Sequence, residues 1–167
     1  DQSNYLVEVG VSCSELALYA TKNNFGPAAF FSGIPGSIGG ALTMNAGCFG
    51  NETWEFVKSV EVMDRNGEIH HLNQKEFSIS YRSVGFPFPL WFLSCVMSFP
   101  EEGFTTIEEL KSMRDSRLER QPLTENTCGS VFKNPDGNHA GDLGDDRGLR
   151  FRLAQPVDDN IFLDPLA

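Results

Sequence analysis

The sequence has few basic residues, no cluster of cysteines and no long apolar run, and each shortage excludes a class of protein. Thirteen Lys and Arg stand against 23 Asp and Glu, which gives a net charge of -10 and disfavours binding to nucleic acid or to an anionic membrane. The longest apolar stretch, residues 90–99, is far shorter than the roughly 20 residues that span a bilayer. We therefore expect no nucleic-acid partner and no membrane partner.

The four cysteines are too far apart in the sequence to indicate a metal site or a disulfide scaffold. Cys13, Cys48, Cys95 and Cys128 form no CxxC pair and no Cys/His cluster, so we expect buried thiols and no metal. Buried free thiols are typical of a reducing compartment, and no basic and apolar leader opens the chain. We therefore expect a cytoplasmic protein.

The chain has 167 residues, which is enough for one ordinary domain or two small ones. Local patterns predict that it is of the α+β class. The alternation in residues 5–11 predicts a strand, and Ser12 with Glu15 has the capping-box spacing of a helix that begins near Cys13. Residues 57–63 and 68–72 flank an Asn-Gly turn and predict a hairpin. Residues 90–99 predict a central strand, and 106–120 predict a helix that Pro122 ends.

A glycine-rich block is the densest chemical signal. It reads Gly33-Ile34-Pro35-Gly36-Ser37-Ile38-Gly39-Gly40-Ala41 and is followed by Asn45-Ala46-Gly47. Glycines let successive backbone N–H groups face a phosphate, and the positive end of a following helix would add to this. The block matches neither the P-loop nor the dinucleotide-binding pattern, so by itself it is equally typical of an ordinary turn.

Two further blocks follow in the chain, and together the three resemble a known family. Tyr81-Arg82-Ser83 ends the strand predicted for 77–81, and Gly129-Ser130-Val131-Phe132-Lys133-Asn134-Pro135 follows Arg120-Gln121-Pro122. In this order the blocks resemble the UDP-N-acetylenolpyruvoylglucosamine reductase family, flavoenzymes of bacterial peptidoglycan synthesis. The resemblance covers roughly residues 7–141.

The resemblance implies an FAD-binding domain of the vanillyl-alcohol-oxidase type at 1–99 and part of a smaller α+β substrate-binding domain at 100–167. It also implies that NADPH reduces FAD, which in turn reduces the enolpyruvyl nucleotide sugar to UDP-N-acetylmuramate. By the same resemblance Arg82 and Ser130 are catalytic. The implied cofactor-binding residues are Gly33, Ile34, Pro35, Gly36, Ser37, Ile38, Gly39, Gly40, Asn45, Ala46 and Gly47, and the implied substrate-binding residues are Tyr81, Arg120, Lys133 and Asn134.

Elementary chemistry is compatible with these roles. A hydride added to one carbon of an enol ether conjugated to a carboxylate leaves enolate-like charge on the other side. An arginine such as Arg82 can stabilise that charge, and a hydroxyl such as that of Ser130 can protonate the carbon. The three histidines have no partner pattern in the sequence, so we expect surface positions for His70 and His71 and assign none of the three to catalysis.

The sequence also departs from the family. Nothing before Tyr5 supplies the family's upstream glycine-rich segment, and no match to its C-terminal catalytic Glu is found, so we expect a chain that is incomplete at both ends. The short path from Arg82 to the 106–120 helix favours the shorter subclass. Two alternatives remain: another flavin oxidoreductase with the same FAD domain, or a truncated, inactive domain that binds only a nucleotide or a partner chain. We expect a monomer that acts on a small nucleotide sugar.

Overall fold

The structure is a computed structural model that describes residues 2–100, 102–103, 105–118, 133 and 137. The chain divides into two compact units, Asp1–Gly129 and Ser130–Ala167. All described helices and strands lie in the first unit, in the order β1 (Gln2–Glu8), α1 (Cys13–Lys22), η1 (Ala28–Gly33), α2 (Ile38–Met44), β2 (Gly47–Cys48), β3 (Asn51–Glu52), η2 (Thr53–Glu55), β4 (Val57–Asp64), β5 (Ile69–Asn73), η3 (Gln74–Glu76), β6 (Ser78–Ser80), β7 (Ser83–Gly85), β8 (Leu90–Pro100) and α3 (Ile107–Leu118).

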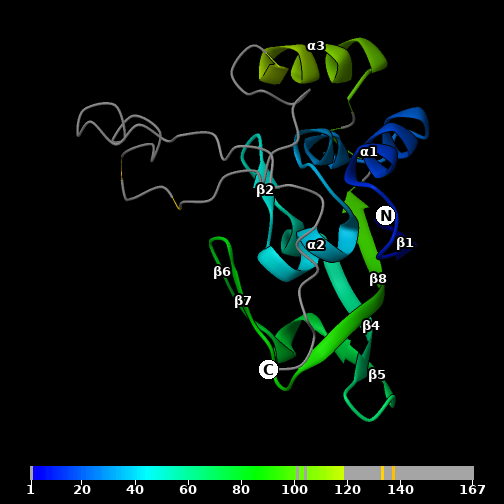
Figure 1. The fold of residues 1–167 in the computed structure, drawn as a ribbon. Coiled ribbons are helices and arrows are strands. Elements are labelled where there is room, and N and C mark those ends of the chain that lie inside the picture. Colours follow the sequence, from blue (N-terminus) through cyan, green and yellow to red (C-terminus); the bar gives the residue numbers. More distant parts are fainter. Residues whose placement is uncertain (1, 101, 104, 119–132, 134–136, 138–167) are drawn as a thin grey trace, which may run out of the picture. The chain divides into compact units, whose positions relative to one another are not determined.

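A four-stranded antiparallel sheet in the order β1-β8-β4-β5 is the centre of the first unit (Figure 1). The predicted hairpin is confirmed, since Val60 faces Leu72 and Met63 faces Ile69 across β4 and β5. The predicted central strand is β8, whose apolar sequence fits a position between two neighbours. The first strand ends at Glu8 and not at the predicted position 11.

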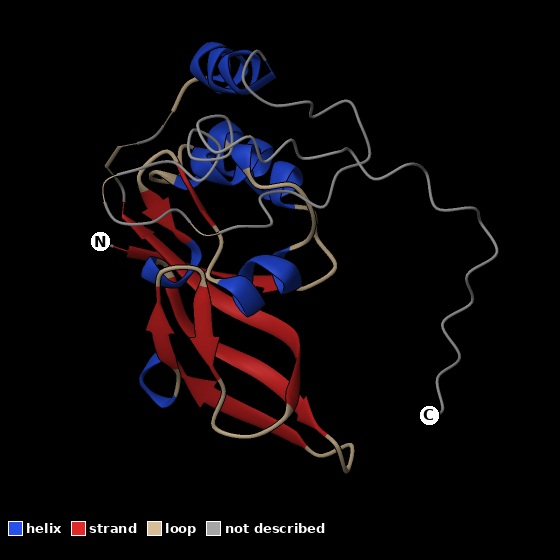
Figure 2. Cartoon of the chain, turned by 60° about the vertical axis from the view of Figure 1, so that its left-hand side comes forward, coloured by secondary structure: helices blue, strands red, loops and turns tan. Residues whose placement is uncertain are grey.

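Helices cover one face of this sheet and supply half of its core. Leu16 and Ala17 of α1 and Ile38 and Leu42 of α2 belong to the same buried cluster as the strand residues Val7, Val60, Cys95 and Met97. Figure 2 shows these helices together with the strands. Leu6, which neighbours Val7 on β1 and therefore points to the opposite face, is 72% exposed. The mixture of a sheet with packed helices agrees with the predicted α+β class.

Hydrogen-bonded side chains cap the N-terminal ends of α1 and α3, and the cap of α1 is the one that the sequence predicted. Ser12 and Glu15 form the capping box of α1, and Thr106 and Glu109 exchange the equivalent hydrogen bonds at α3. Leu110 of α3 joins the core of the first unit, while positions 119 and 120 of the predicted helix lie outside the described residues. Within the described residues, no helix combines the length and apolarity needed to cross a membrane.

The two fully buried cysteines match the expectation of buried thiols. Cys13 and Cys95 are both 0% exposed. Burial raises the pKa of Cys13 to about 11 and that of Cys95 to about 12, so both remain protonated at neutral pH. Cys128 lies outside the described residues.

Replacing Ser12 by Ala should destabilise the full protein by about 1 kcal/mol, the usual cost of a lost N-cap. The Ser12 hydroxyl donates to Glu15 Oε2 at 2.7 Å and accepts from the Glu15 N–H at 3.2 Å. The side-chain bond first, and the backbone bond second, lower the pKa of Glu15 from its ordinary 4.5. Urea denaturation measures the stability, and carboxyl NMR titration should show that pKa rising toward 4.5 in the variant.

The sign of the pH effect follows from this shift. A carboxyl group whose pKa is lower in the folded state stabilises the fold above its unfolded pKa, and this contribution is lost as the pH falls through the folded pKa. The difference between wild type and Ser12→Ala should therefore shrink below pH 4.5. Glu15→Gln, which keeps an acceptor oxygen but does not titrate, is the control. An unchanged Glu15 pKa in Ser12→Ala would contradict the assignment.

Candidate functional site

The glycine-rich loop lies against the link between β1 and α1. Ile38 N–H donates to the Val11 carbonyl and Gly39 N–H to the Val9 carbonyl, both at 2.9 Å, while the Gly36 carbonyl accepts from Cys13 N–H at 2.9 Å. The first N–H groups of α2 therefore already have protein partners. Within the described residues, the N–H groups of Gly36 and Ser37 donate to no protein acceptor, so the exposed donors of this loop precede the helix.

The loop needs glycine at different positions for different structural reasons. Gly36 has φ +107°, a conformation that side chains rarely adopt. A Cβ on Gly39 would lie 3.1 Å from the Cβ of Val9, whereas a Cβ on Gly40 would have no neighbour within 4 Å. Gly39 thus permits close packing inside the protein, and Gly40 leaves a stretch of exposed backbone beside the Gly36 and Ser37 donors. This combination can cradle an anionic or planar ligand.

Asn45 is the polar centre of the segment that follows α2. It ends the helix in the left-handed region, with φ 44° and ψ 52°, and is 1% exposed. Its Oδ1 accepts from Trp54 N–H at 3.1 Å, and its Nδ2 donates to Glu52 Oε2 at 2.7 Å and to the Ser80 carbonyl at 3.1 Å. All three interactions are internal to the protein.

Ala46 and Gly47 continue this junction through their backbone. The Ala46 carbonyl accepts from the N–H and the hydroxyl of Thr53, at 3.0 and 2.7 Å. A Cβ on Gly47 would lie 2.7 Å from the Asn51 carbonyl across the β2–β3 pair, so only glycine fits there. The predicted cofactor residues Asn45, Ala46 and Gly47 therefore hold the local backbone in place.

Arg82 lies in a two-residue turn. Ser80 and Ser83 pair across β6 and β7, so Tyr81 and Arg82 form the tip, whereas the sequence predicted a strand over 77–81. Arg82 has φ 49° and is half-buried, while Tyr81 is 50% exposed. A positive φ is unfavourable for a residue of this size, and such backbone strain clusters at functional sites.

The structure brings this turn to the glycine-rich segment. The Asn45 hydrogen bond to Ser80 joins positions 35 apart in the sequence, immediately before Tyr81 and Arg82. The predicted residues Arg82, Tyr81 and Asn45 therefore share one region of the first unit. Arg120, Ser130 and Asn134 lie outside the described residues, and Lys133 is an exposed residue of the second unit, so their grouping with Arg82 stays a prediction.

Sequence reasoning missed Glu52 and Phe49. Glu52 accepts the shortest bond of Asn45, but a single Glu next to a turn carries no pattern that points to such a partner. Phe49 is 44% exposed, has φ 52° and precedes Gly50 with φ +84°. The Phe-Gly pair between β2 and β3 is a two-residue hairpin turn in which both residues have positive φ, and the glycine was the available signal.

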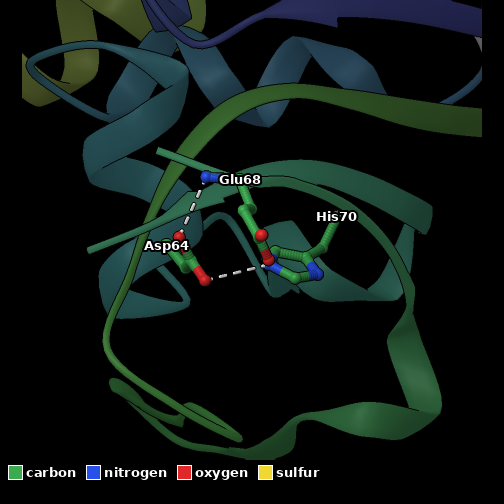
Figure 3. A group of neighbouring side chains, drawn as sticks. All are labelled: Asp64, Glu68 and His70. Carbon is green, nitrogen blue, oxygen red and sulfur yellow. Dashed lines mark hydrogen bonds and ion pairs between the residues drawn. The ribbon is translucent and has the colours of Figure 1, made fainter. Parts of the chain in front are cut away.

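Asp64, Glu68 and His70 form the only group of potential metal ligands within the described part of the chain, with ligand atoms within 4.8 Å of one another. Figure 3 shows that the group spans the β4–β5 turn. Asp64 accepts from Asn66 N–H at 2.8 Å, Glu68 N–H at 3.0 Å and His70 Nε2 at 3.2 Å. Desolvation opposes ionisation, but these hydrogen bonds outweigh it and lower the pKa of Asp64. We interpret the group as a hydrogen-bonded turn.

The histidine pair has partners that the sequence pattern did not indicate. His70 contacts Asp64, and His71 Nδ1 lies 3.6 Å from Glu61 Oε2. Glu61 and His71 face each other in the β4–β5 register. Both histidines of β5 therefore lie next to a carboxylate of β4.

Comparisons with known proteins agree with this fold. The family described as FAD binding domain matches residues 3–73. The crystal structure of UDP-N-acetylenolpyruvylglucosamine reductase (MurB) from Thermus caldophilus superimposes with a TM-score of 0.70 at 28% identity, covering 87% of this chain and 54% of that chain. The predicted FAD-binding fold class is thereby confirmed.

Several curated relatives share one name. UDP-N-acetylenolpyruvoylglucosamine reductase of Alkalilimnicola ehrlichii is 41% identical over 144 residues, which is 86% of this chain and 48% of that protein. The enzymes of the same name from Legionella pneumophila (strain Paris) and Coxiella burnetii (strain Dugway 5J108-111) are also 41% identical, over 145 and 147 residues, covering 86% of this chain and 48% and 46% of those proteins. The chain thus spans about half the length of the curated relatives that it matches.

Arg82→Gly should be more stable than Arg82→Ala by about 1 kcal/mol, because both changes remove the guanidinium but only glycine relieves the left-handed backbone. Urea denaturation of the two full-length variants measures the difference. Ser83→Gly and Ser83→Ala are the matched control pair in β7, where glycine should instead be the less stable residue. Equal stability of the two Arg82 variants would show that the turn at Arg82 is not strained.

Proposed function

This chain belongs to the UDP-N-acetylenolpyruvoylglucosamine reductase family over 86% of its length, and we propose that the protein containing it reduces UDP-N-acetylglucosamine enolpyruvate to UDP-N-acetylmuramate. The reaction uses FAD as cofactor and NADPH as hydride donor. The observation that carries the proposal is the 41% identity over 144 residues to a reductase of that name. The three sequence blocks around Gly36, Arg82 and Ser130 belong to the same sequence similarity and agree with it.

The residues of the glycine-rich loop fit a flavin nucleotide. The Gly36 and Ser37 N–H groups can donate to a diphosphate, and the open backbone at Gly40 allows close approach. When bound, FAD supplies hydride transfer from NADPH to the enolpyruvyl carbon. The predicted block from Gly33 to Gly40 forms the cofactor site in this proposal, with the contacts made at Gly36, Ser37 and Gly40, and Asn45, Ala46 and Gly47 fix the backbone beside it.

Two residues act on the substrate. In this proposal Arg82 binds the carboxylate of the enolpyruvyl group, where a planar guanidinium stabilises the negative charge that develops. Ser130 donates the proton that completes the reduction. Tyr81, Arg120, Lys133 and Asn134 bind the nucleotide sugar, whose carboxylate and diphosphate need cationic and neutral donors.

We also propose a cytoplasmic monomer with a domain boundary between residues 99 and 100, and with no nucleic-acid or membrane partner.

Two alternatives make different demands on the chain. Another flavin oxidoreductase with the same FAD domain would need the glycine-rich loop but not the block from Gly129 to Pro135. A truncated domain that only binds a nucleotide or a partner chain would need no turnover at all. The 41% identity extends over 86% of the chain, beyond the FAD-binding match at residues 3–73, and this favours the reductase.

Gly40→Ala should weaken FAD binding by about tenfold without destabilising the apoprotein, because its Cβ enters open space that the cofactor would occupy. In the first turn of α2, alanine should even favour the helix. Gly39→Ala is the matched neighbour, and it should instead destabilise the apoprotein, because its Cβ meets Val9. Equilibrium titration of apoprotein with FAD and urea denaturation provide the two measurements. Unchanged FAD affinity in Gly40→Ala would remove the loop from the cofactor site.

Ser130→Ala should separate the two half-reactions of the full protein. Reduction by NADPH needs no proton on the sugar carbon, so its rate should stay within about twofold of wild type. Reoxidation by the enolpyruvyl substrate should slow by ~10²–10⁴-fold, the usual contribution of a general acid. Stopped-flow absorbance records both steps. Equal slowing of both steps would overturn the role of Ser130.

The proposed function as a whole has its own test. A full-length protein that gains no flavin spectrum with excess FAD would overturn it.

A further inference from the structure

We propose that Asn45 and Glu52 are positioning residues that fix the turn carrying Arg82 relative to the glycine-rich loop. The inference rests on the proposed function, because it assigns the two residues an effect on the step in which Arg82 takes part. Asn45 follows directly from the α2 helix that begins within the glycine-rich block, and Glu52 lies on the facing strand β3. Neither residue needs to contact the substrate.

The first argument is the saturation of the Asn45 side chain. A carboxamide offers two N–H donors and one oxygen acceptor in a plane. Here Nδ2 donates to Glu52 Oε2 and to the Ser80 carbonyl, and Oδ1 accepts from Trp54 N–H, at 2.7, 3.1 and 3.1 Å. With the residue 1% exposed, these partners define the orientation of the amide. The side chain is thus fully engaged by protein groups and is directed at the β6–β7 hairpin.

The second argument is the position of the Ser80 carbonyl. The β6–β7 pair is a separate two-stranded sheet that does not belong to the main sheet, so its tip is not held by the main ladder. At its base, Phe77 packs against Trp54 and Phe92, with ring centroids 4.7 and 6.0 Å apart. At its tip, Ser80 immediately precedes the Tyr81-Arg82 turn and accepts from Asn45. The amide therefore anchors the hairpin at the residue where the turn begins.

The third argument is the pair of left-handed residues at the two ends of this connection. Asn45 has φ 44° and Arg82 has φ 49°. Asparagine adopts this region more readily than other side-chain residues, whereas arginine does not. Such a conformation at Arg82 persists only if its surroundings impose it. A hydrogen bond to the carbonyl two residues earlier is one such constraint.

Glu52 explains why the amide keeps this orientation. Its Oε2 accepts the 2.7 Å bond from Asn45, and a bond to a carboxylate is stronger than one between neutral groups. The Glu52 side chain also accepts from the Glu55 N–H, and the Glu52 N–H donates to Glu55 Oε2 at 3.2 Å. The carboxylate is therefore held by the η2 turn on one side and orients Asn45 on the other.

The activity test compares variants of the full-length protein by the two half-reactions. Asn45→Ala and Glu52→Ala should slow reoxidation by the enolpyruvyl substrate by about tenfold or more, and this loss should exceed any change in flavin content or in reduction by NADPH. Glu52→Gln keeps an acceptor oxygen and should restore reoxidation to within about twofold. Asn51→Ala is the control, since Asn51 lies in the same β2–β3 hairpin and its side chain contacts the Phe49 carbonyl; it should behave like wild type.

A double-mutant cycle tests whether the effect passes through Arg82. If Asn45 acts by positioning Arg82, then adding Asn45→Ala to Arg82→Lys should slow reoxidation by less than about twofold beyond Arg82→Lys alone. A role in general stability predicts independent, multiplying effects. Multiplying effects, or loss of flavin in proportion to the loss of rate, would overturn the proposal. Should Asn45→Ala fail to fold, Glu52→Ala carries the same cycle.

A measurement without turnover keeps this proposal separate from the proposed function. In ¹⁵N-labelled full-length protein, the backbone chemical shifts of Tyr81, Arg82 and Ser83 should change in Asn45→Ala and in Glu52→Ala but not in Asn51→Ala. If wild type does not reduce the enolpyruvyl substrate, the proposed function fails, and these shifts still decide whether the pair fixes the turn. Unmoved turn signals would overturn the positioning role, whatever the activity.

Discussion

Two backbone hydrogen bonds, from Ile38 and Gly39 to the carbonyls of Val11 and Val9, determine where the rest of the site lies. They attach the start of α2 to the link between β1 and α1. The glycine-rich loop therefore lies beside that link. Because these N–H groups are taken, the loop donors without an acceptor in the described part of the chain are those of Gly36 and Ser37. The direction of α2 then places Asn45 next to the β6–β7 hairpin, and every later element of the site follows from that placement.

Packing and hydrogen bonding have different roles in holding the hairpin. Trp54 is 1% and Phe77 7% exposed, and full burial of a large apolar side chain is worth roughly 1.5–3 kcal/mol. A neutral hydrogen bond contributes a net ~1 kcal/mol. The aromatic contacts therefore supply most of the stability that keeps the hairpin on the core. They are not directional enough to set the backbone of Arg82, and the Asn45 bond to Ser80 supplies that direction.

The sequence predicted the elements whose signals are local. The capping box at Ser12, the β4–β5 hairpin and the apolar strand β8 each depend on residues within a few positions of one another, and all three are observed. The end of the first strand was predicted at Val11 and lies at Glu8, because Val9 and Val11 continue the alternation of a strand. Val9 N–H still donates to the Leu93 carbonyl of β8, but the carbonyls of Val9 and Val11 accept from the α2 backbone. The end of β1 is thus set by hydrogen bonds to α2, which lies about thirty residues further along the chain, and a local pattern cannot show them.

The sequence singled out residues for the proposed site but could not give their geometry. The glycine block and the Tyr-Arg-Ser block pointed to Arg82 through the family resemblance. No local rule favours a positive φ at an arginine, so the turn could not be predicted. The partners of Asn45 are 7, 9 and 35 positions away, and only the fold reveals that its side chain faces inward.

Local donors and not the net charge decide how an acidic chain can hold anionic ligands. At physiological ionic strength, exposed charges more than about 8 Å apart are largely screened, so a net charge of -10 disfavours close contact with a polyanion but repels a small, distant anion only weakly. A negative group close to the loop matters more, and Glu52 lies next to Asn45. Its carboxylate accepts from Asn45 Nδ2 and from the Glu55 N–H, so part of its acceptor capacity is used inside the protein. In the proposed site a cofactor at the loop would meet the Gly36 and Ser37 N–H groups, which could bind a diphosphate without any lysine. Although it is negatively charged, the Glu52 carboxylate therefore supports the turn that carries Arg82, because it orients the Asn45 amide.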